Sequence, residues 1–168
     1  EDTLRISIGT KSDNNLLIDL LQGCNDYMPV NFIEKVRSTK ETMISLRIDP
    51  KGRTENEITS GIPFIDHMLE QIPVHAGFSM RLIAEGDLQN GPHHTIEDIG
   101  IVLGDSLYEF LSSEKSNNRY GFALPMDDSG ANVMIDFGRR AFLRWDVAFP
   151  VPFIEGIESD MFRHFFDT

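Results

Sequence analysis

Alternating apolar and polar side chains mark several stretches of this chain as predicted β-strands. Residues 3–8, 42–49 and 78–84 follow a period of two, which places apolar groups on one face of a strand and polar groups on the other. The same pattern predicts three later strands, at 120–126, 131–137 and 142–149. Between the first two of these, the sequence Asp-Asp-Ser-Gly from Asp127 predicts a tight turn. The polar run that ends at Glu57 predicts a loop or the returning strand of a hairpin.

Apolar residues recur at helical spacing in two longer stretches. Residues 62–72 carry apolar side chains every three or four positions and are followed by Pro73, which predicts a helix that ends there. A second helix is predicted from Pro92, because proline suits the first helical position, where its missing N–H costs no hydrogen bond. Two shorter helices are predicted at 14–21 and 157–166. In the helix after Pro92, the apolar residues fall on one side and are expected to be buried: Ile96, Ile99, Leu103, Leu107 and Phe110.

The order of these elements divides the chain into three predicted pieces. Residues 1–30 are expected to form a separate appendage, and Asn31–Arg37 a linker or lead-in. Residues 31–118 and 119–168 share an order, strands followed by a helix that carries histidine. This shared order indicates an internal duplication of one half-domain, with the second copy cut short.

Composition narrows the class of protein. The length of 168 residues suits one ordinary domain, with or without a short appendage. A net charge of −12 excludes a broad basic face for nucleic acid. The single cysteine, Cys24, excludes an internal disulfide and fits a reducing compartment. Because no stretch approaches the ~20 apolar residues of a membrane span and none reads as a signal peptide, we expect a soluble cytoplasmic protein.

Three side chains of the kind that bind metals fall within five residues of one another. They are His93, His94 and Glu97. On a helix, His94 lies about 100° around the axis from His93, and Glu97 falls between them at about 40°. All three therefore project from one side, while the two imidazoles diverge enough to bind two different metal ions. A histidine and a glutamate four residues apart more often make a solvent-exposed contact than a metal site. Two adjacent histidines in a chain that has only five histidines favour a metal site instead.

Two further histidines, His67 and His164, lie inside apolar runs. A buried histidine needs a partner for each ring nitrogen, and a metal ion is one such partner. The pattern alone leaves open that both are core histidines satisfied by ordinary hydrogen bonds.

Seven short segments, in order and at matching spacing, give the chain from Val36 to Phe166 a resemblance to imidazoleglycerol-phosphate dehydratase. The segments are RSTKET from Arg37, GIPFIDHML from Gly61, GDL from Gly86, HHTIED from His93, RYGF from Arg119, PMDD from Pro125 and HFF from His164. The resemblance implies an α/β (α+β) fold made of a duplicated half-domain, with helices on one face of a mixed β-sheet. It also implies a large homo-oligomer whose neighbouring subunits share each site.

The resemblance carries a function and a set of residues with it. It implies dehydration of imidazole glycerol phosphate to imidazole acetol phosphate in histidine biosynthesis, with two Mn²⁺ ions in each complete site. The implied metal ligands are His67, His93, His94, Glu97 and His164. The implied catalytic residues are Glu41 and Glu97, and the implied substrate contacts are Glu41, His67, His75, His93, Arg119 and Arg140.

The chemistry of these residue types agrees with such a reaction. Removal of a carbon-bound hydrogen and loss of hydroxide leave charge on the imidazole ring, which a metal on the ring nitrogen stabilises as a Lewis acid. A carboxylate such as that of Glu41 is suited to move the proton, and two arginines to grip the phosphate. Two alternatives stay open: a metal-dependent hydrolase, and a truncated protomer that binds metal without turnover.

The chain also departs from the family pattern. A second His-His-x-x-Glu motif and a Ser-Lys-Gly tail are absent from the 168 residues, so we expect this chain by itself to be poorly soluble and inactive. Pro73 falls within the expected helix from His67 to His75 and puts the place of His75 in question. Arg139 replaces a glycine, which leaves Arg140 as the aligned phosphate ligand. Residues 1–24 instead resemble the C-terminal end of histidinol-phosphate aminotransferase.

Overall fold

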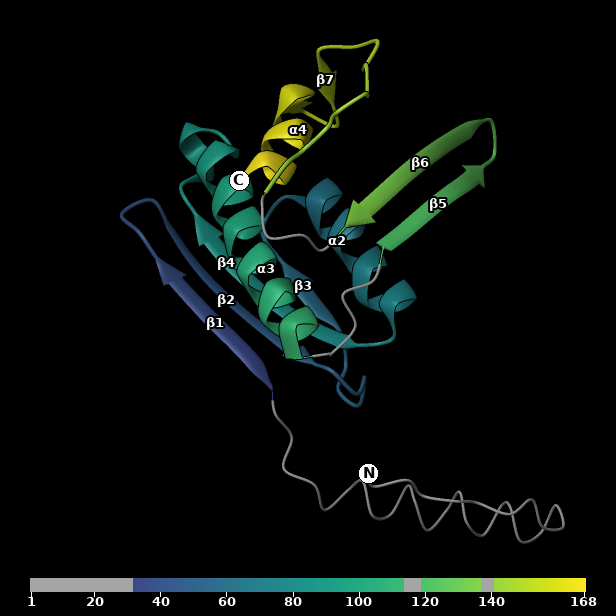
Figure 1. Ribbon diagram of the computed structural model, residues 1–168. Helices are drawn as coiled ribbons and strands as arrows, with labels where there is room; N and C mark the ends of the chain where they lie inside the picture. The colour runs from purple at the N-terminus through teal and green to yellow at the C-terminus, as the bar shows by residue number, and fades with distance from the viewer. Residues whose placement is uncertain (1–31, 114–118, 137–140) are drawn as a thin grey trace, which may run out of the picture. The chain divides into compact units, whose positions relative to one another are not determined.

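The computed structural model describes residues 32–113, 119–136 and 141–168 (Figure 1). The predicted strand at 3–8, the predicted helix at 14–21, Cys24 and Arg140 lie outside the described residues. In chain order the elements are β1 Ile33–Ser38, β2 Thr42–Asp49, β3 Glu57–Thr59, α2 Pro63–Ala76, β4 Ser79–Gly86, the short 3₁₀ helix η1 Leu88–Asn90, α3 His93–Ser113, β5 Arg119–Met126, β6 Ser129–Asp136, β7 Phe153–Ile154, β8 Ile157–Glu158 and α4 Asp160–Asp167.

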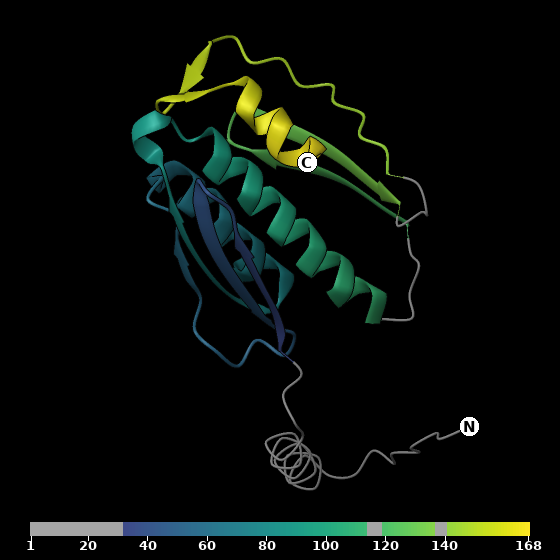
Figure 2. The same ribbon diagram turned by 90° about the vertical axis from the view of Figure 1, so that its left-hand side faces the viewer.

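A four-stranded sheet carries the helices on one of its faces. The strand order is β1-β2-β4-β3, with β3 parallel to β4 and the other neighbours antiparallel, so the sheet is mixed. Figure 2 shows α3 lying along one face of the sheet, with α4 on the other side of α3. The fully buried apolar side chains come from both layers: Ile44, Leu46, Ile48, Met80 and Leu82 from the sheet, Ile96 and Ile99 from α3. The predicted mixed α/β architecture is confirmed.

The prediction that Asn31–Arg37 is a linker is wrong, because residues from Ile33 onward form β1 and pair with β2. The alternation of apolar and polar residues does not predict this strand, because the residues that face the helices include the charged Lys35 and Arg37. Lys35 reaches Glu109 of α3, with 2.5 Å between Nζ and Oε2, and Arg37 reaches Asp98 of the same helix. Each charge has a partner in the helix layer, so the strand pairs although its inner face is not apolar.

Two other predictions are changed by the structure. The polar run before Glu57 is a loop, as one of the two predicted alternatives has it. Glu57 itself opens a short strand that the pattern did not predict, β3 Glu57–Thr59, which pairs parallel to β4 at the sheet edge. Residues 142–149 are not a strand. Their aromatic rings pack on α4 instead, Trp145 against Phe166 with centroids 5.7 Å apart and Phe149 against Phe162 at 5.5 Å.

Helix α2 does not end at Pro73 as predicted but continues through it to Ala76. Pro73 is buried inside the helix, where it removes only one backbone hydrogen bond. The helix ends at Gly77, whose φ of 77° is left-handed, a conformation that costs glycine little. His75 therefore lies on the last turn of α2, with its side chain exposed.

The second part of the chain begins, like the first, with an antiparallel hairpin. Strands β5 and β6 pair from Arg119 with Asp136 to Met126 with Ser129, around the predicted turn at Asp127. Every residue of both strands is exposed. The predicted helix of 157–166 is present but starts later, at Asp160, because Ile157 and Glu158 form β8.

Helix α4 packs on α3 through a close approach at Gly100. A Cβ at this position would lie 2.8 Å from the carbonyl oxygen of Phe165 and 2.7 Å from the hydroxyl oxygen of Thr168. No ordinary side chain fits there without moving α4. Gly100 lies one turn of α3 after Glu97, and Phe165 directly follows His164, so this contact sets how closely the two helices bring those two residues.

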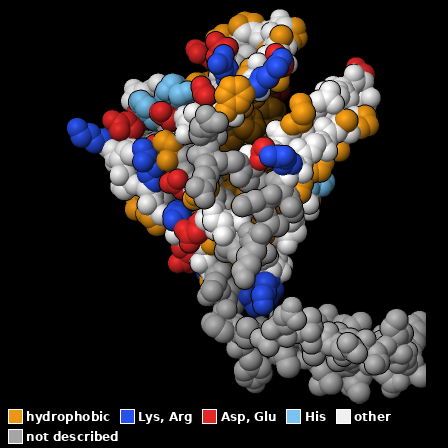
Figure 3. Space-filling view, in the orientation of Figure 1, with side chains coloured by type: hydrophobic (Ala, Val, Ile, Leu, Met, Phe, Trp, Pro, Cys, Tyr) orange, Lys and Arg blue, Asp and Glu red, His pale blue; other side chains and the backbone are white. Residues whose placement is uncertain are grey.

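An apolar groove of about 700 Å³ opens beside this contact, lined by side chains of α2, α3 and α4 and of the segment before β7. Figure 3 shows hydrophobic side chains in the recess beneath α4. Phe166, one of the residues that line this groove, is 62% exposed. In the part of the chain that the structure describes, no helix has the length and apolar character needed to cross a membrane.

We expect Gly100→Ala to lower the free energy of unfolding by about 1–3 kcal/mol, since the new methyl group overpacks the contact between α3 and α4. Gly104 lies one turn further along α3, and a Cβ there would meet nothing within 4 Å. Gly104→Ala should therefore raise stability by about 0.5–1 kcal/mol, through helix propensity alone. Chemical denaturation of both variants checks this. Equal effects of the two substitutions would contradict the close approach.

Candidate metal centre

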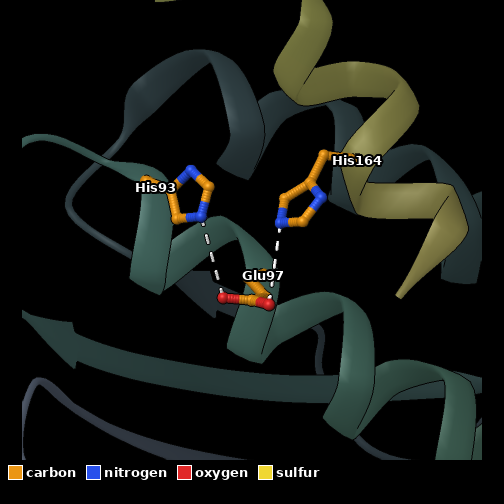
Figure 4. A group of neighbouring side chains, drawn as sticks. All are labelled: His93, Glu97 and His164. Atoms are coloured by element: carbon orange, nitrogen blue, oxygen red, sulfur yellow. Dashed lines mark ion pairs between the residues drawn. The ribbon is translucent and has the colours of Figure 1, made fainter.

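The structure brings three metal-type side chains together from two helices. The carboxylate of Glu97 contacts the imidazoles of both His93 and His164, whose rings stack with their centroids 4.8 Å apart (Figure 4). Glu97 Oε2 is 3.8 Å from His93 Nε2, and Glu97 Oε1 is 3.6 Å from His164 Nε2. One donor atom from each residue lies within 4.8 Å of the others. His93 and Glu97 are one turn apart on α3, while His164 comes from α4, 67 residues further along the chain than Glu97.

The His164 ring suggests what the group of three is suited to hold. Its Nε2 atom is buried and has no hydrogen-bond partner, although it points toward Glu97. A buried polar atom without a partner costs free energy, and a cation placed between the three donors would remove that cost. Two imidazole nitrogens and a carboxylate suit Mn²⁺, Fe²⁺ or Zn²⁺. These residues therefore fit a divalent transition metal.

The neighbouring His94 ring faces away from this group. Its plane is nearly perpendicular to that of His93, at 88°, and its Nδ1 lies 3.4 Å from Oδ1 of Asp87. Asp87 also accepts a hydrogen bond from Asn90, and this bond, followed by the contact with His94, lowers the pKa of Asp87 from its ordinary value. The two adjacent histidines thus diverge as the helical spacing suggests. That they bind different ions stays a prediction. Figure 3 shows histidine side chains over the start of α3.

The two histidines of α2 lie outside the group of three. His67 and His75 are both exposed, so the alternative that His67 is a satisfied core histidine is wrong. Among the described residues, the group whose donor atoms approach one another contains His93, Glu97 and His164. His67 therefore presents its ring to solvent.

Glu41, the expected acid–base residue, lies at the tip of the β1–β2 hairpin with its side chain exposed. The tip is well tied down. The hydroxyl of Thr39 accepts the backbone N–H of Glu41 at 3.2 Å and that of Thr42 at 3.0 Å. The carbonyl of Glu41 accepts the N–H of Asp87 at 3.1 Å.

A buried carboxylate, Asp98, joins this hairpin to α3, and sequence reasoning missed it. Asp98 accepts Arg37 Nε at 2.6 Å, the Thr42 hydroxyl, and the Thr39 hydroxyl at 3.4 Å. Burial tends to raise the pKa of Asp98, but the hydrogen bonds from Thr42 and Arg37 and the charge of Arg37 outweigh it and hold the pKa below its ordinary value. The only feature of the sequence that could have pointed to Asp98 is its position directly after Glu97.

Of the two expected phosphate-binding arginines, the structure describes one. Arg119 opens β5 and pairs across the hairpin with Asp136, with 2.9 Å between Nε and Oδ2. Both side chains are largely exposed. An exposed pair of this kind is weak, so the guanidinium is free to exchange Asp136 for another anion at little cost.

Comparisons with known proteins show what this chain is similar to. The model of the imidazoleglycerol-phosphate dehydratase family matches residues 60–168. The histidine biosynthesis bifunctional protein HisB of Buchnera aphidicola subsp. Schizaphis graminum is 44% identical over 133 residues, which are 79% of this chain and 38% of that protein. HisB of Bacteroides fragilis is 45% identical over 132 residues, 79% of this chain and 35% of that protein. The chain thus spans little more than a third of the length of these relatives.

Two solved structures share the fold. An imidazoleglycerol-phosphate dehydratase from Staphylococcus aureus has a TM-score of 0.70 and 27% identity, over 81% of this chain and 75% of that one. The enzyme from Pyrococcus furiosus, solved in complex with (S)-C348, has a TM-score of 0.67 and 35% identity, over 79% of this chain and 70% of that one. Since the family model covers more than half of the chain and the fold agrees, the chain belongs to the imidazoleglycerol-phosphate dehydratase family.

Proposed function

We propose that the protein containing this chain catalyses the metal-dependent dehydration of imidazole glycerol phosphate to imidazole acetol phosphate in histidine biosynthesis. The observation that carries the proposal is the convergence of His93, Glu97 and His164 around a buried nitrogen without a partner. A hydro-lyase that acts on an imidazole needs a cation beside the ring, and these side chains suit one. Membership of the dehydratase family supports the choice of substrate.

In this proposal the cation is Mn²⁺, with two ions in each complete site. His93, Glu97 and His164 hold one ion, and His94 and His67 contribute to the set of donors. A bound ion supplies a Lewis acid for the imidazole ring of the substrate. Neutral imidazole nitrogens and a carboxylate are the forms that bind it, so the affinity for metal should weaken as the histidines become protonated.

The remaining roles fall to side chains around these donors. Glu41, held at the hairpin tip, moves the proton that leaves the carbon, and Glu97 is the second catalytic carboxylate. Arg119 and Arg140 bind the phosphate through charge-assisted hydrogen bonds, and His67, His75 and His93 contact the substrate.

A shared site in a large homo-oligomer accounts for the exposed α2 histidines. His67 and His75 project into solvent rather than toward the other donors of this chain. An exposed donor is available to a neighbouring subunit, so we assign these two residues to sites completed by assembly. The protein is proposed to act in the cytoplasm.

The first expected outcome is water loss from imidazole glycerol phosphate with Mn²⁺ present and none after chelation. Glu97→Gln should weaken Mn²⁺ binding by more than about a hundred-fold, because changes to the partners of metal ligands alone cost 10- to 100-fold. The matched control is Glu109→Gln, an exposed glutamate on the same helix that pairs with Lys35 and should bind metal normally. Ester hydrolysis without dehydration would identify a metal hydrolase, and metal binding without turnover a non-catalytic protomer.

The second expected outcome concerns the two adjacent histidines. His94→Ala should lower the Mn²⁺ content by about one ion per site, because the His94 ring diverges from the group around Glu97. Elemental analysis of the purified assembly measures this. Two ions retained at unchanged affinity would contradict the assignment of His93 and His94 to different ions.

The third expected outcome concerns the phosphate. Arg140→Ala should raise the Michaelis constant about ten- to a hundred-fold, since a charge-assisted hydrogen bond contributes roughly 1.5–3 kcal/mol. Arg139→Ala, a change of the same size at the next residue, should have much less effect. Steady-state kinetics compare the two. Equal effects would show that the alignment of these arginines is wrong.

A further inference from the structure

The turn that carries Glu41 is fixed to helix α3 at the residue next to Glu97. Thr39 and Thr42 flank the turn, and both hydroxyls reach Oδ2 of Asp98. They also contact each other, with 3.0 Å between their oxygens. The same Thr39 hydroxyl accepts the backbone N–H groups of Glu41 and Thr42. A chain of hydrogen bonds therefore runs from the Asp98 carboxylate to the backbone of Glu41.

The Asp98 carboxylate is buried and both of its oxygens are occupied. The residue is only 5% exposed, Oδ1 accepts Arg37 Nε at 2.6 Å, and Oδ2 accepts the threonine hydroxyls. A buried carboxylate whose two oxygens already accept hydrogen bonds is poorly placed to meet a metal or a substrate. Its contribution must therefore come through the groups that it holds in place.

A second contact holds the same turn, through Asp87. The N–H of Asp87 donates to the carbonyl of Glu41, and the Asp87 side chain lies 3.4 Å from His94. Glu41 is thus held between two anchors, one adjacent in sequence to Glu97 and the other in contact with His94. Neither anchor involves the Glu41 carboxylate itself, which stays exposed.

We propose that Asp98, acting through Thr39 and Thr42, is a positioning residue that holds Glu41 at a fixed place relative to the donors of α3. The inference rests on the proposed function, because it takes Glu41 as the residue that moves a proton. Proton transfer needs the carboxylate within hydrogen-bond reach of the reacting carbon, and an error of about 1 Å lowers the rate by a large factor. A turn fixed to the helix that also carries Glu97 keeps the two carboxylates in constant relation.

The test uses three substitutions in the whole protein. Asp98→Ala removes the acceptor, and Thr42→Val removes one hydroxyl while it keeps the shape of the side chain, which guards against failure of the first variant to fold. Thr42→Ser restores the hydroxyl. The matched control is Asp49→Ala, at the opposite end of β2. Asp49 is also buried, at 2%, and accepts backbone N–H groups and Arg53, but lies at the other end of the strand from the turn.

Two measurements report on the turn and on the chemistry. Amide hydrogen exchange of residues 39–42 should rise about ten-fold in Asp98→Ala and Thr42→Val, because each loses a net hydrogen bond that holds the turn, and not in Thr42→Ser or Asp49→Ala. The turnover number should fall about ten-fold in the first two variants with little change in the Michaelis constant or in Mn²⁺ affinity. In a Glu41→Gln background, Thr42→Val should cost no further turnover, since both changes act through one side chain.

Unchanged exchange at residues 39–42, or additive losses in the double variant, overturns the inference. Loss of Mn²⁺ binding in Thr42→Val also overturns it, because the residue would then support the metal site instead of Glu41. If the wild-type protein does not dehydrate the substrate, the proposed function fails. The positioning role of Asp98 in catalysis then fails as well. If only the positioning role is wrong, the wild-type protein still dehydrates the substrate.

Discussion

The site depends on the burial of helix α3 between two layers. Its apolar side packs on the sheet through Ile96 and Ile99, both fully buried, and α4 covers another part of it at Gly100. Burial of such side chains contributes roughly 1.5–3 kcal/mol each, so the rotation of the helix about its axis is strongly fixed. That rotation in turn decides where His93 and Glu97 point. The candidate metal ligands therefore gain their geometry from apolar contacts on the opposite side of the helix.

A second constraint is the contact between helices that lie far apart in the sequence. His164 reaches Glu97 only because α4 approaches α3 where α3 has no side chain, at Gly100. Close approach of this kind brings backbone near backbone and leaves little freedom for sliding. A polar site can then be built across the two helices although each contributes only one or two donors.

The periodicity of apolar residues was sufficient to predict the elements in which buried and exposed residues alternate regularly. It predicted β2, β4 and the apolar side of α3, because the buried residues of each recur at the period of a strand or a helix. It failed for β1, whose inward charges find partners only in the folded molecule. It failed again at 142–149, where an alternating pattern belongs to aromatic rings that pack on α4.

The candidate site divides in the same way. The spacing of His93, His94 and Glu97 predicted one polar side of a helix, since those residues are local in sequence. The approach of His164 and the role of Asp98 depend on contacts between residues about 60 positions apart, which no local pattern contains. Asp98, Thr39 and Thr42 are also ordinary polar residues in the sequence, so nothing distinguishes a buried anchor from a solvated side chain until the fold is known.

The ion pairs of β1 have one more consequence, for association between molecules. This strand lies at one edge of the described sheet, where its outer backbone groups are open to pairing with a strand of another chain. On this edge strand, Lys35 and Arg37 form ion pairs with α3 and stay half-exposed. A strand from another molecule that paired with β1 would therefore lie next to two cationic side chains. The opposite edge is β3, which has only three residues and offers a short template. Charge at one edge and brevity at the other both disfavour uncontrolled growth of the sheet.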